Sequence, residues 1–144
     1  MRFWDSSALV PLVVQQPGSA EVEAWLAADP ELVTWTLCGV EIVSALRRLA
    51  RDGVLRESVV AGAEDLASEL LRRSHVVVDV ERVKALATRL LRVHALRAGD
   101  ALQLGAALAW ADGAPAELVL HTFDQRLALA ARREGFRVFP DGKG

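Results

Sequence analysis

The chain is poor in the residues and segments that several common functions require. Its 144 residues include one cysteine, Cys38, so an intramolecular disulfide is excluded and a reducing compartment is the natural setting. No apolar stretch is long enough to span a bilayer, and no basic segment followed by an apolar run opens the chain. We therefore expect a soluble, cytoplasmic protein without a membrane partner.

The motifs of several enzyme classes are also missing. The sequence has no Gly-rich phosphate-binding loop and no Gly-x-Ser-x-Gly nucleophile elbow. Its net charge of −2 gives no general basic field that would attract nucleic acid. Zinc-ligand spacing is absent among the three histidines and the cysteine, which are His75, His94, His121 and Cys38.

The chain does contain enough apolar material for one folded domain. Hydrophobic residues make up 52% of the sequence and charged residues 25%. A domain of this length buries roughly two-thirds of the surface that its unfolded chain exposes. We expect a single domain over residues 1–140 and a flexible tail over residues 141–144.

Strand-like and helix-like segments alternate along this domain. Such alternation favours an α/β fold of three layers, α/β/α, with a central and mostly parallel sheet. Ligands of such sheets bind outside the carboxyl ends of the strands, where the strand order reverses. The expected strands cover residues 2–5, 31–36, 75–80, 118–122 and 136–139, and the expected helices cover residues 8–16, 19–28, 37–52, 55–73, 81–96, 100–111 and 124–134.

Four carboxylates occur where that rule places a site. Asp5 closes the first expected strand, and Asp124 follows the strand at 118–122. Asp100 opens an expected helix, and Glu41 lies one turn inside another. Clustered without a cation, such groups repel by roughly 4 kcal/mol per pair at contact distance near a protein surface. A hard divalent ion such as Mg²⁺ or Mn²⁺ prefers oxygen ligands, and it can polarise a phosphodiester and activate a water.

Three of these carboxylates, taken singly, are explained as well by helix capping or solvation. Asp5 is a good N-cap residue for the helix that follows it. Asp124 can favour the positive end of its helix, although Thr122 and Gln125 can form a capping box without it. Glu41 can be an ordinary solvated helix residue.

Asp100 is harder to explain as a surface residue. It heads a helix that is apolar nearly all round, from Ala101 to Trp110. Such a helix is usually buried, and a charge at its start needs a partner. Capping and metal binding remain equally open for this carboxylate.

Four segments around the carboxylates follow one another in a characteristic order. They are residues 3–9 (FWDSSAL), 40–46 (VEIVSAL), 96–104 (LRAGDALQL) and 122–127 (TFDQRL), followed by Ala130, Ala131 and Gly135. In this order and spacing they resemble the four motifs of the PIN-domain ribonucleases, especially VapC-type toxins of bacterial toxin–antitoxin pairs. The resemblance covers nearly the whole chain.

The resemblance implies an endonucleolytic ribonuclease that depends on Mg²⁺ or Mn²⁺. It implies RNA as the substrate, a cognate antitoxin that covers the site, and a second copy of the chain in a homodimer. The catalytic set that it implies is Asp5, Glu41, Asp100 and Asp124, with Asp5, Asp100 and Asp124 on the metal and Ser6 and Thr122 in support.

Arginine supplies nearly all of the positive charge. Its planar guanidinium can donate two hydrogen bonds to one phosphate. Ordinary solvated helix faces explain the arginine clusters equally well. Within the ribonuclease interpretation, the candidate RNA-binding residues are Arg47, Arg97 and Arg126.

Three other functions compete with a toxin ribonuclease. A PIN nuclease that processes RNA without an antitoxin is barely separated from a toxin by sequence. A haloacid-dehalogenase-like hydrolase needs a second Asp two residues after Asp5, where Ser7 stands, and a receiver domain needs a well-placed Lys. A non-catalytic module of the same fold would have lost one or more of the acids, and none is missing.

Overall fold

Parallel strands form the middle layer of the protein. In the computed structural model, which describes residues 1–142, the spatial order of the strands is β3-β2-β1-β4-β5, and every neighbouring pair is parallel. The expected parallel sheet is therefore confirmed. The order reverses between β1 and β4, so the switch point lies at the carboxyl ends of these two strands. The strands are β1 (Arg2–Trp4), β2 (Leu32–Trp35), β3 (His75–Val77), β4 (Val119–His121) and β5 (Arg137–Phe139).

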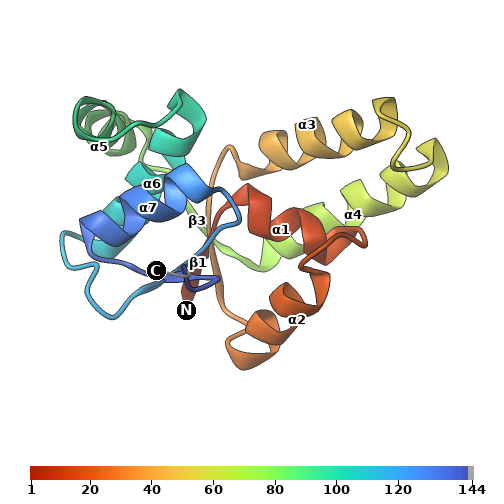
Figure 1. Cartoon of the computed structure of the whole chain (residues 1–144), viewed down its shortest axis with the longest axis horizontal. Coiled ribbons are helices and arrows are strands. Elements are labelled where there is room, and N and C mark those ends of the chain that lie inside the picture. Colours follow the sequence, from red (N-terminus) through yellow and green to blue (C-terminus); the bar gives the residue numbers. More distant parts are fainter. Residues whose placement is uncertain (143–144) are drawn as a thin grey trace.

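Helices cover both faces of this sheet, which completes the three layers (Figure 1). Helices α3 and α4 also form a hairpin that extends away from the sheet (Figure 1). Among the described residues, no helix is long and apolar enough to cross a membrane. One face carries α1 (Ser6–Val13), α2 (Ser19–Ala28), α3 (Cys38–Arg51) and α4 (Glu57–Arg73), and the other carries α5 (Val80–Val93), α6 (Ala98–Ala111) and α7 (Gln125–Glu134).

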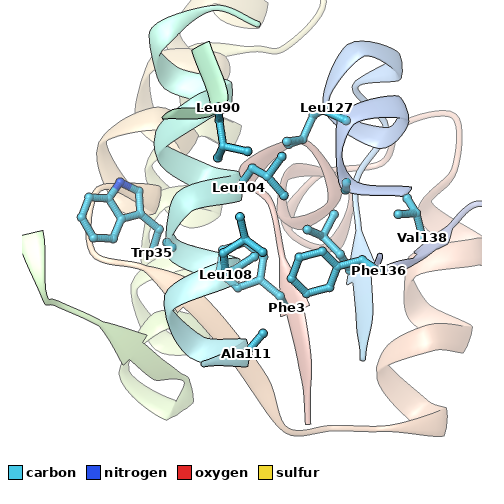
Figure 2. Close-up of a cluster of buried hydrophobic side chains, with 14 of the residues drawn as sticks. Phe3, Trp35, Leu90, Leu104, Leu108, Ala111, Leu127, Phe136 and Val138 are labelled. Atoms are coloured by element: carbon cyan, nitrogen blue, oxygen red, sulfur yellow. The ribbon is translucent and has the colours of Figure 1, made fainter. Parts of the chain in front are cut away.

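Two neighbouring residues of β1 show how the sheet is buried on both sides. Successive side chains of a strand point to opposite faces. Phe3 packs with Leu104 and Leu127 in the core beneath α5, α6 and α7 (Figure 2). Trp4 lies in the other core, with Ile42 of α3 among its members. Each face of β1 is therefore fixed by its own hydrophobic core.

Helix α6 is held against α5 at a glycine. A Cβ atom on Gly105 would lie 3.0 Å from the carbonyl oxygen of Val83 and 3.3 Å from the amide nitrogen of Ala87. A side chain at this position would crowd both backbone atoms, so glycine favours this close approach of the two helices. The position of α6, which carries Asp100, is thus set by close packing.

Capping side chains explain where three elements differ from their expected bounds. Helix α1 begins at Ser6 rather than at residue 8, because the Asp5 carboxylate caps it. Strand β3 ends at Val77, since Asp79 caps α5 and leaves Val78 66% exposed. The expectation of a buried strand through residue 80 was therefore wrong. Helix α6 begins at Ala98, which places Asp100 inside the first turn rather than at the start.

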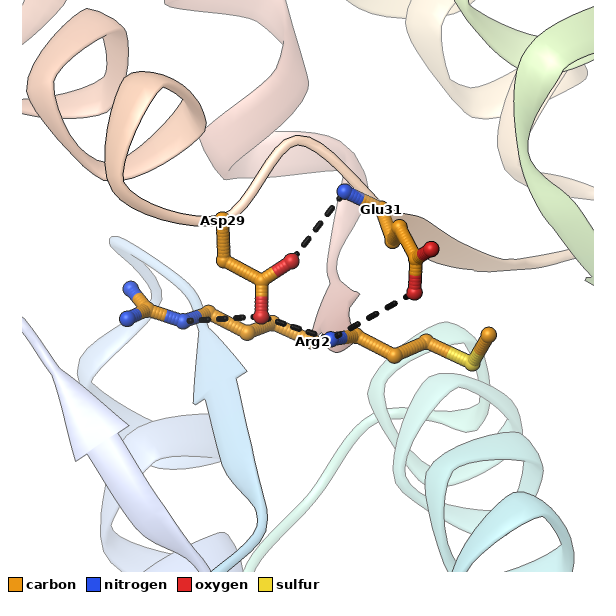
Figure 3. Close-up of polar contacts among 4 residues, drawn as sticks. Arg2, Asp29 and Glu31 are labelled. Atoms are coloured by element: carbon orange, nitrogen blue, oxygen red, sulfur yellow. Dashed lines mark hydrogen bonds and ion pairs between the residues drawn. The ribbon is translucent and has the colours of Figure 1, made fainter.

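The beginning of β1 is tied down at the end of the sheet opposite to Asp5. The terminal ammonium group of Met1 donates to Oδ2 of Asp29 at 2.6 Å, and Nε of Arg2 lies 3.7 Å from the same oxygen (Figure 3). The backbone N–H of Glu31 donates to Oδ1 of Asp29 at 3.1 Å. The hydrogen bond from the ammonium group lowers the pKa of Asp29. This ion cluster thus joins β1 to the turn before β2.

The expected tail falls only in part within the described residues. Asp141 and Gly142 are exposed, and Nη2 of Arg132 donates to the carbonyl oxygen of Pro140 at 2.9 Å. Residues 143 and 144 lie outside the described range.

Candidate functional site

Asp5 lies at the switch point of the sheet, directly after β1. Its side chain is buried, with 4% of the residue exposed. Its Oδ2 atom accepts hydrogen bonds from Oγ of Ser7 at 2.6 Å and from Oγ1 of Thr122 at 2.8 Å. Burial raises the pKa of Asp5, and the two hydroxyl donors oppose that shift. The carboxylate is thus held in one orientation at the carboxyl end of the sheet.

Asp124 follows β4, the strand that pairs with β1, and it caps helix α7. Its Oδ1 atom accepts a hydrogen bond from the backbone N–H of Leu127 at 2.9 Å, and its own N–H donates to Oγ1 of Thr122 at 3.0 Å. The expectation that Thr122 and Gln125 cap this helix without Asp124 was wrong, because Thr122 lies in the turn before the cap. The cap engages one of two carboxylate oxygens, so capping does not exclude metal binding.

Glu41 approaches the site from α3 on the other side of Asp5. Its Oε1 atom accepts a hydrogen bond from Nε2 of Gln103 at 2.8 Å. The hydroxyl of Ser6 lies between the two acids, 3.4 Å from Oδ1 of Asp5 and 3.5 Å from Oε2 of Glu41. A Cβ atom on Gly99 would lie 3.7 Å from Oε2 of Glu41, so the first turn of α6 also reaches this carboxylate.

The carboxylates lie in one another's electrostatic field. Burial raises the pKa of Glu41 to about 7, and the charges of Asp5 and Asp100 add to the shift. The pKa of Asp100 is raised by burial first and by Asp124 next, and Asp124 also raises that of Asp5. Four acids from separate elements therefore form one electrostatic unit with an excess of negative charge.

Cavities flank this unit, and one of them is rich in arginine. A cavity of about 350 Å³ is lined by Asp100 and Asp124 together with Arg97 and Arg126. The structure thus brings two of the three candidate RNA-binding arginines to the carboxylates. The third, Arg47, does not line this cavity, because its guanidinium pairs with Glu57 and Glu64 across the α3–α4 hairpin.

The profile of the PIN domain matches residues 2–133 of this chain. The chain belongs to the PIN-domain family. It is similar to ribonuclease VapC45 of Mycobacterium tuberculosis strain CDC 1551 / Oshkosh and to ribonuclease VapC49 of strain ATCC 25618 / H37Rv. Each is 35% identical over 139 residues, which cover 96% of this chain and 94% of the relative. The resemblance inferred from the four motifs is therefore confirmed.

A solved structure shows the same PIN fold. The crystal structure of VapC20 of Mycobacterium tuberculosis, a sarcin-ricin-loop-cleaving toxin, superposes with a TM-score of 0.63. It is 17% identical, and the match covers 90% of this chain and 95% of VapC20. At this identity the comparison supports the fold, and the function must be argued from the site.

The donor set of this PIN domain suits a hard divalent cation. Carboxylate and hydroxyl oxygens surround Asp5, and oxygen ligands are what Mg²⁺ and Mn²⁺ prefer. Burial, with smaller contributions from the neighbouring acids, raises the pKa values of Asp5, Glu41 and Asp100, and a bound cation would stabilise their charged forms. Within residues 1–142, no three acidic, histidine or cysteine side chains converge closely enough to form a finished metal cage. The residues therefore fit such an ion by chemistry and charge.

Sequence reasoning missed three residues of the site. Ser7, rather than Ser6, makes the short hydrogen bond to Asp5, although both were visible as hydroxyls after the strand. Arg48 lines a cavity of about 420 Å³ beside Glu41, whereas its neighbour Arg47 does not. The sequence signal for the third, Gln103, was its position as a lone polar residue within an apolar helix.

His121 precedes Thr122 but belongs to an aromatic cluster. Its ring is fully buried and stacks on Trp25, with 4.5 Å between centroids and 9° between planes. Neither ring nitrogen has a hydrogen-bond partner in the described part of the chain. Burial lowers the pKa of His121 to about 3, so the ring is neutral at physiological pH.

Proposed function

We propose that this PIN domain is a divalent-metal-dependent endoribonuclease and the toxin of a VapBC-type pair. The observation that carries the proposal is the convergence of four carboxylates at one switch point, where burial and mutual repulsion raise three of their pKa values. The names of the VapC relatives support RNA as the substrate. Mg²⁺ or Mn²⁺ is the cofactor that the oxygen donors suit best.

The residues of the site would have different roles in phosphodiester hydrolysis. Asp5, Asp100 and Asp124 would hold the ion, which polarises the phosphodiester and activates a water when bound. The hydroxyls of Ser7 and Thr122 keep the Asp5 carboxylate in position.

Glu41 and the arginines complete this assignment. With a pKa of about 7, Glu41 is suited to accept a proton from the attacking water near neutral pH. Arg97 and Arg126, on the wall of the carboxylate cavity, would bind the RNA phosphates. Basic side chains beside the acids also allow an anionic polymer to approach an acidic protein.

A protein partner and a second copy of the chain complete the proposal. Val40 and Val43 are 70% and 40% exposed on α3, and Val40 lines the same cavity as Glu41 and Arg48. An apolar rim beside a charged groove suits a protein segment that blocks access to the acids. A cognate antitoxin is the partner that the VapC relatives favour, and we propose a homodimer as the assembly.

Cleavage of a circular RNA tests this function directly. A circle has no ends, so only an endonuclease can convert it to linear fragments. We expect linear products with Mg²⁺ or Mn²⁺ and none with EDTA. Products that form only from linear RNA would contradict an endonuclease, and an intact substrate in every metal would favour a non-catalytic module of the same fold.

A further inference from the structure

Gln103 is a polar side chain inside an otherwise apolar stretch of α6. Only 1% of the residue is exposed, and its neighbours Leu104 and Ala106 belong to the hydrophobic core. Buried polar groups in folded proteins are almost always hydrogen-bonded. The partner here is Oε1 of Glu41, which accepts a hydrogen bond from Nε2 of Gln103 at 2.8 Å.

This hydrogen bond joins two helices that each carry an acid of the site. Gln103 lies one turn after Asp100 on α6, and residues three apart share one face of a helix. Cys38 lies one turn before Glu41 on α3, and its sulfur lies 3.6 Å from Nε2 of Gln103. The amide therefore bridges the helix of Asp100 and the helix of Glu41.

The orientation of the amide is fixed by the carboxylate. Turning the amide over would place its oxygen against Oε1 of Glu41, and two acceptors repel. In the orientation observed, Oε1 of Gln103 is buried and has no hydrogen-bond partner among residues 1–142. A buried carbonyl without a partner is unfavourable, so the side chain is placed for its N–H group.

We propose that Gln103 is a positioning residue, which holds the Glu41 carboxylate at a fixed place relative to Asp100. The close packing of α6 on α5 at Gly105 gives the amide a rigid base. Without the donor, the Glu41 side chain gains freedom to rotate away from the other acids. This role rests on the proposed function, because it concerns the same site.

The variant Gln103→Met tests the role, since it keeps the length of the side chain and removes the donor. We expect a fall in kcat of about 10–100-fold, with KM for RNA within about twofold of the wild type. Calorimetry of the protein with Mn²⁺ alone should show a dissociation constant raised about tenfold, because the Glu41 carboxylate, which interacts with Asp5 and Asp100, can move away from the ion that they would hold. The matched control is Leu104→Met, which alters the buried residue next to Gln103 and should change none of these values.

The outcomes separate this inference from the proposed function. A folded Gln103→Met variant that cleaves RNA and binds Mn²⁺ like the wild type would overturn the positioning role and leave the ribonuclease intact. A wild-type chain that binds no Mn²⁺ and cleaves no RNA would instead contradict the proposed function and, with it, this inference. If the Met variant does not fold, Gln103→Leu removes the same donor. A fall in kcat together with an equally large rise in KM in that variant would indicate a merely structural role.

Discussion

Thr122 and Asp5 are 117 residues apart in the sequence, yet Oγ1 of Thr122 donates a hydrogen bond to Oδ2 of Asp5 at 2.8 Å. Thr122 follows β4 and Asp5 follows β1. These two strands pair at the point in the sheet where the strand order reverses. The same Thr122 oxygen accepts from the backbone N–H of Asp124 at 3.0 Å. One hydroxyl therefore links two acids of the site.

Removing that hydroxyl should impair catalysis more than folding. We expect Thr122→Val to lower kcat about 10–100-fold, because Asp5 loses a donor and the turn before Asp124 loses its acceptor. Thr122→Ser keeps the hydroxyl and should retain most of the activity. Steady-state cleavage of RNA by the two variants checks this, and equal activity of both would show that the hydroxyl is not needed.

Neutralising Asp5 should abolish cleavage without weakening the fold. The pKa of this buried acid is raised, so its charge opposes folding at neutral pH, and Asn is also a good N-cap for α1. We expect Asp5→Asn to lose activity by about 100-fold or more, with a Tm equal to that of the wild type or up to about 4 °C higher.

An acid outside the site provides the control for Asp5. Glu134 accepts hydrogen bonds from Nη2 of Arg89 at 2.7 Å and pairs with Nε2 of His94 at 2.8 Å, and Arg89 lowers its pKa. Glu134→Gln should therefore lower the Tm and leave cleavage unchanged. A thermal melt that shows Asp5→Asn as the less stable variant would indicate that Asp5 serves mainly as a cap.

Cleavage should depend on pH through the protonation of Glu41. Its pKa is raised from 4.5 to about 7, so the folded protein binds a proton that the unfolded chain releases between these values. The contribution of Glu41 to metal-free stability is therefore present below about pH 4.5 and is lost as the pH rises through about 7. Cleavage should show the opposite trend, rising about tenfold per pH unit below 7, because a proton on Glu41 opposes both base catalysis and metal binding.

A pH–rate profile at two Mn²⁺ concentrations measures this effect. The midpoint should move to lower pH at the higher Mn²⁺ concentration, since the metal competes with the proton. The Glu41→Gln variant should cleave RNA much more slowly than the wild type, and its rate should not increase with pH in this range. A wild-type rate that stays flat from about pH 6 to about pH 8 would contradict a role for this proton.

Much of the site follows from the sequence because it depends on strand ends. Asp5 and Asp124 directly follow strands, and parallel strands place their carboxyl ends at one edge of a sheet. Gln103 could not be assigned in this way, since its role depends on a hydrogen bond between α6 and α3, which lie on opposite faces of the sheet. Arg47 was assigned to RNA from its charge, and only the structure shows its pairing with Glu57 and Glu64.

Acid should destabilise the protein through His121. Its pKa is lowered from 6.5 to about 3 by burial, so below pH 6.5 the unfolded chain binds a proton that the folded ring does not. Between about pH 7.5 and about pH 5 the wild type should lose about 2 kcal/mol of unfolding free energy from this source. His121→Phe should keep the stacking on Trp25 and avoid this loss, which urea unfolding at both pH values measures. An identical pH dependence in the two proteins would show that a proton reaches the buried ring.

The most direct test is the metal dependence of RNA cleavage by the wild type and by Asp100→Asn in one titration with Mn²⁺. Asp100 lines the arginine-rich cavity with Asp124, and its charge contributes to the field at Asp5 and Glu41. We predict that the wild type cleaves only when the metal is added and that Asp100→Asn, although folded, cleaves at least about 100-fold more slowly at every concentration. Cleavage that persists in EDTA, or an Asp100→Asn variant as active as the wild type, would contradict a carboxylate-bound metal as the basis of activity.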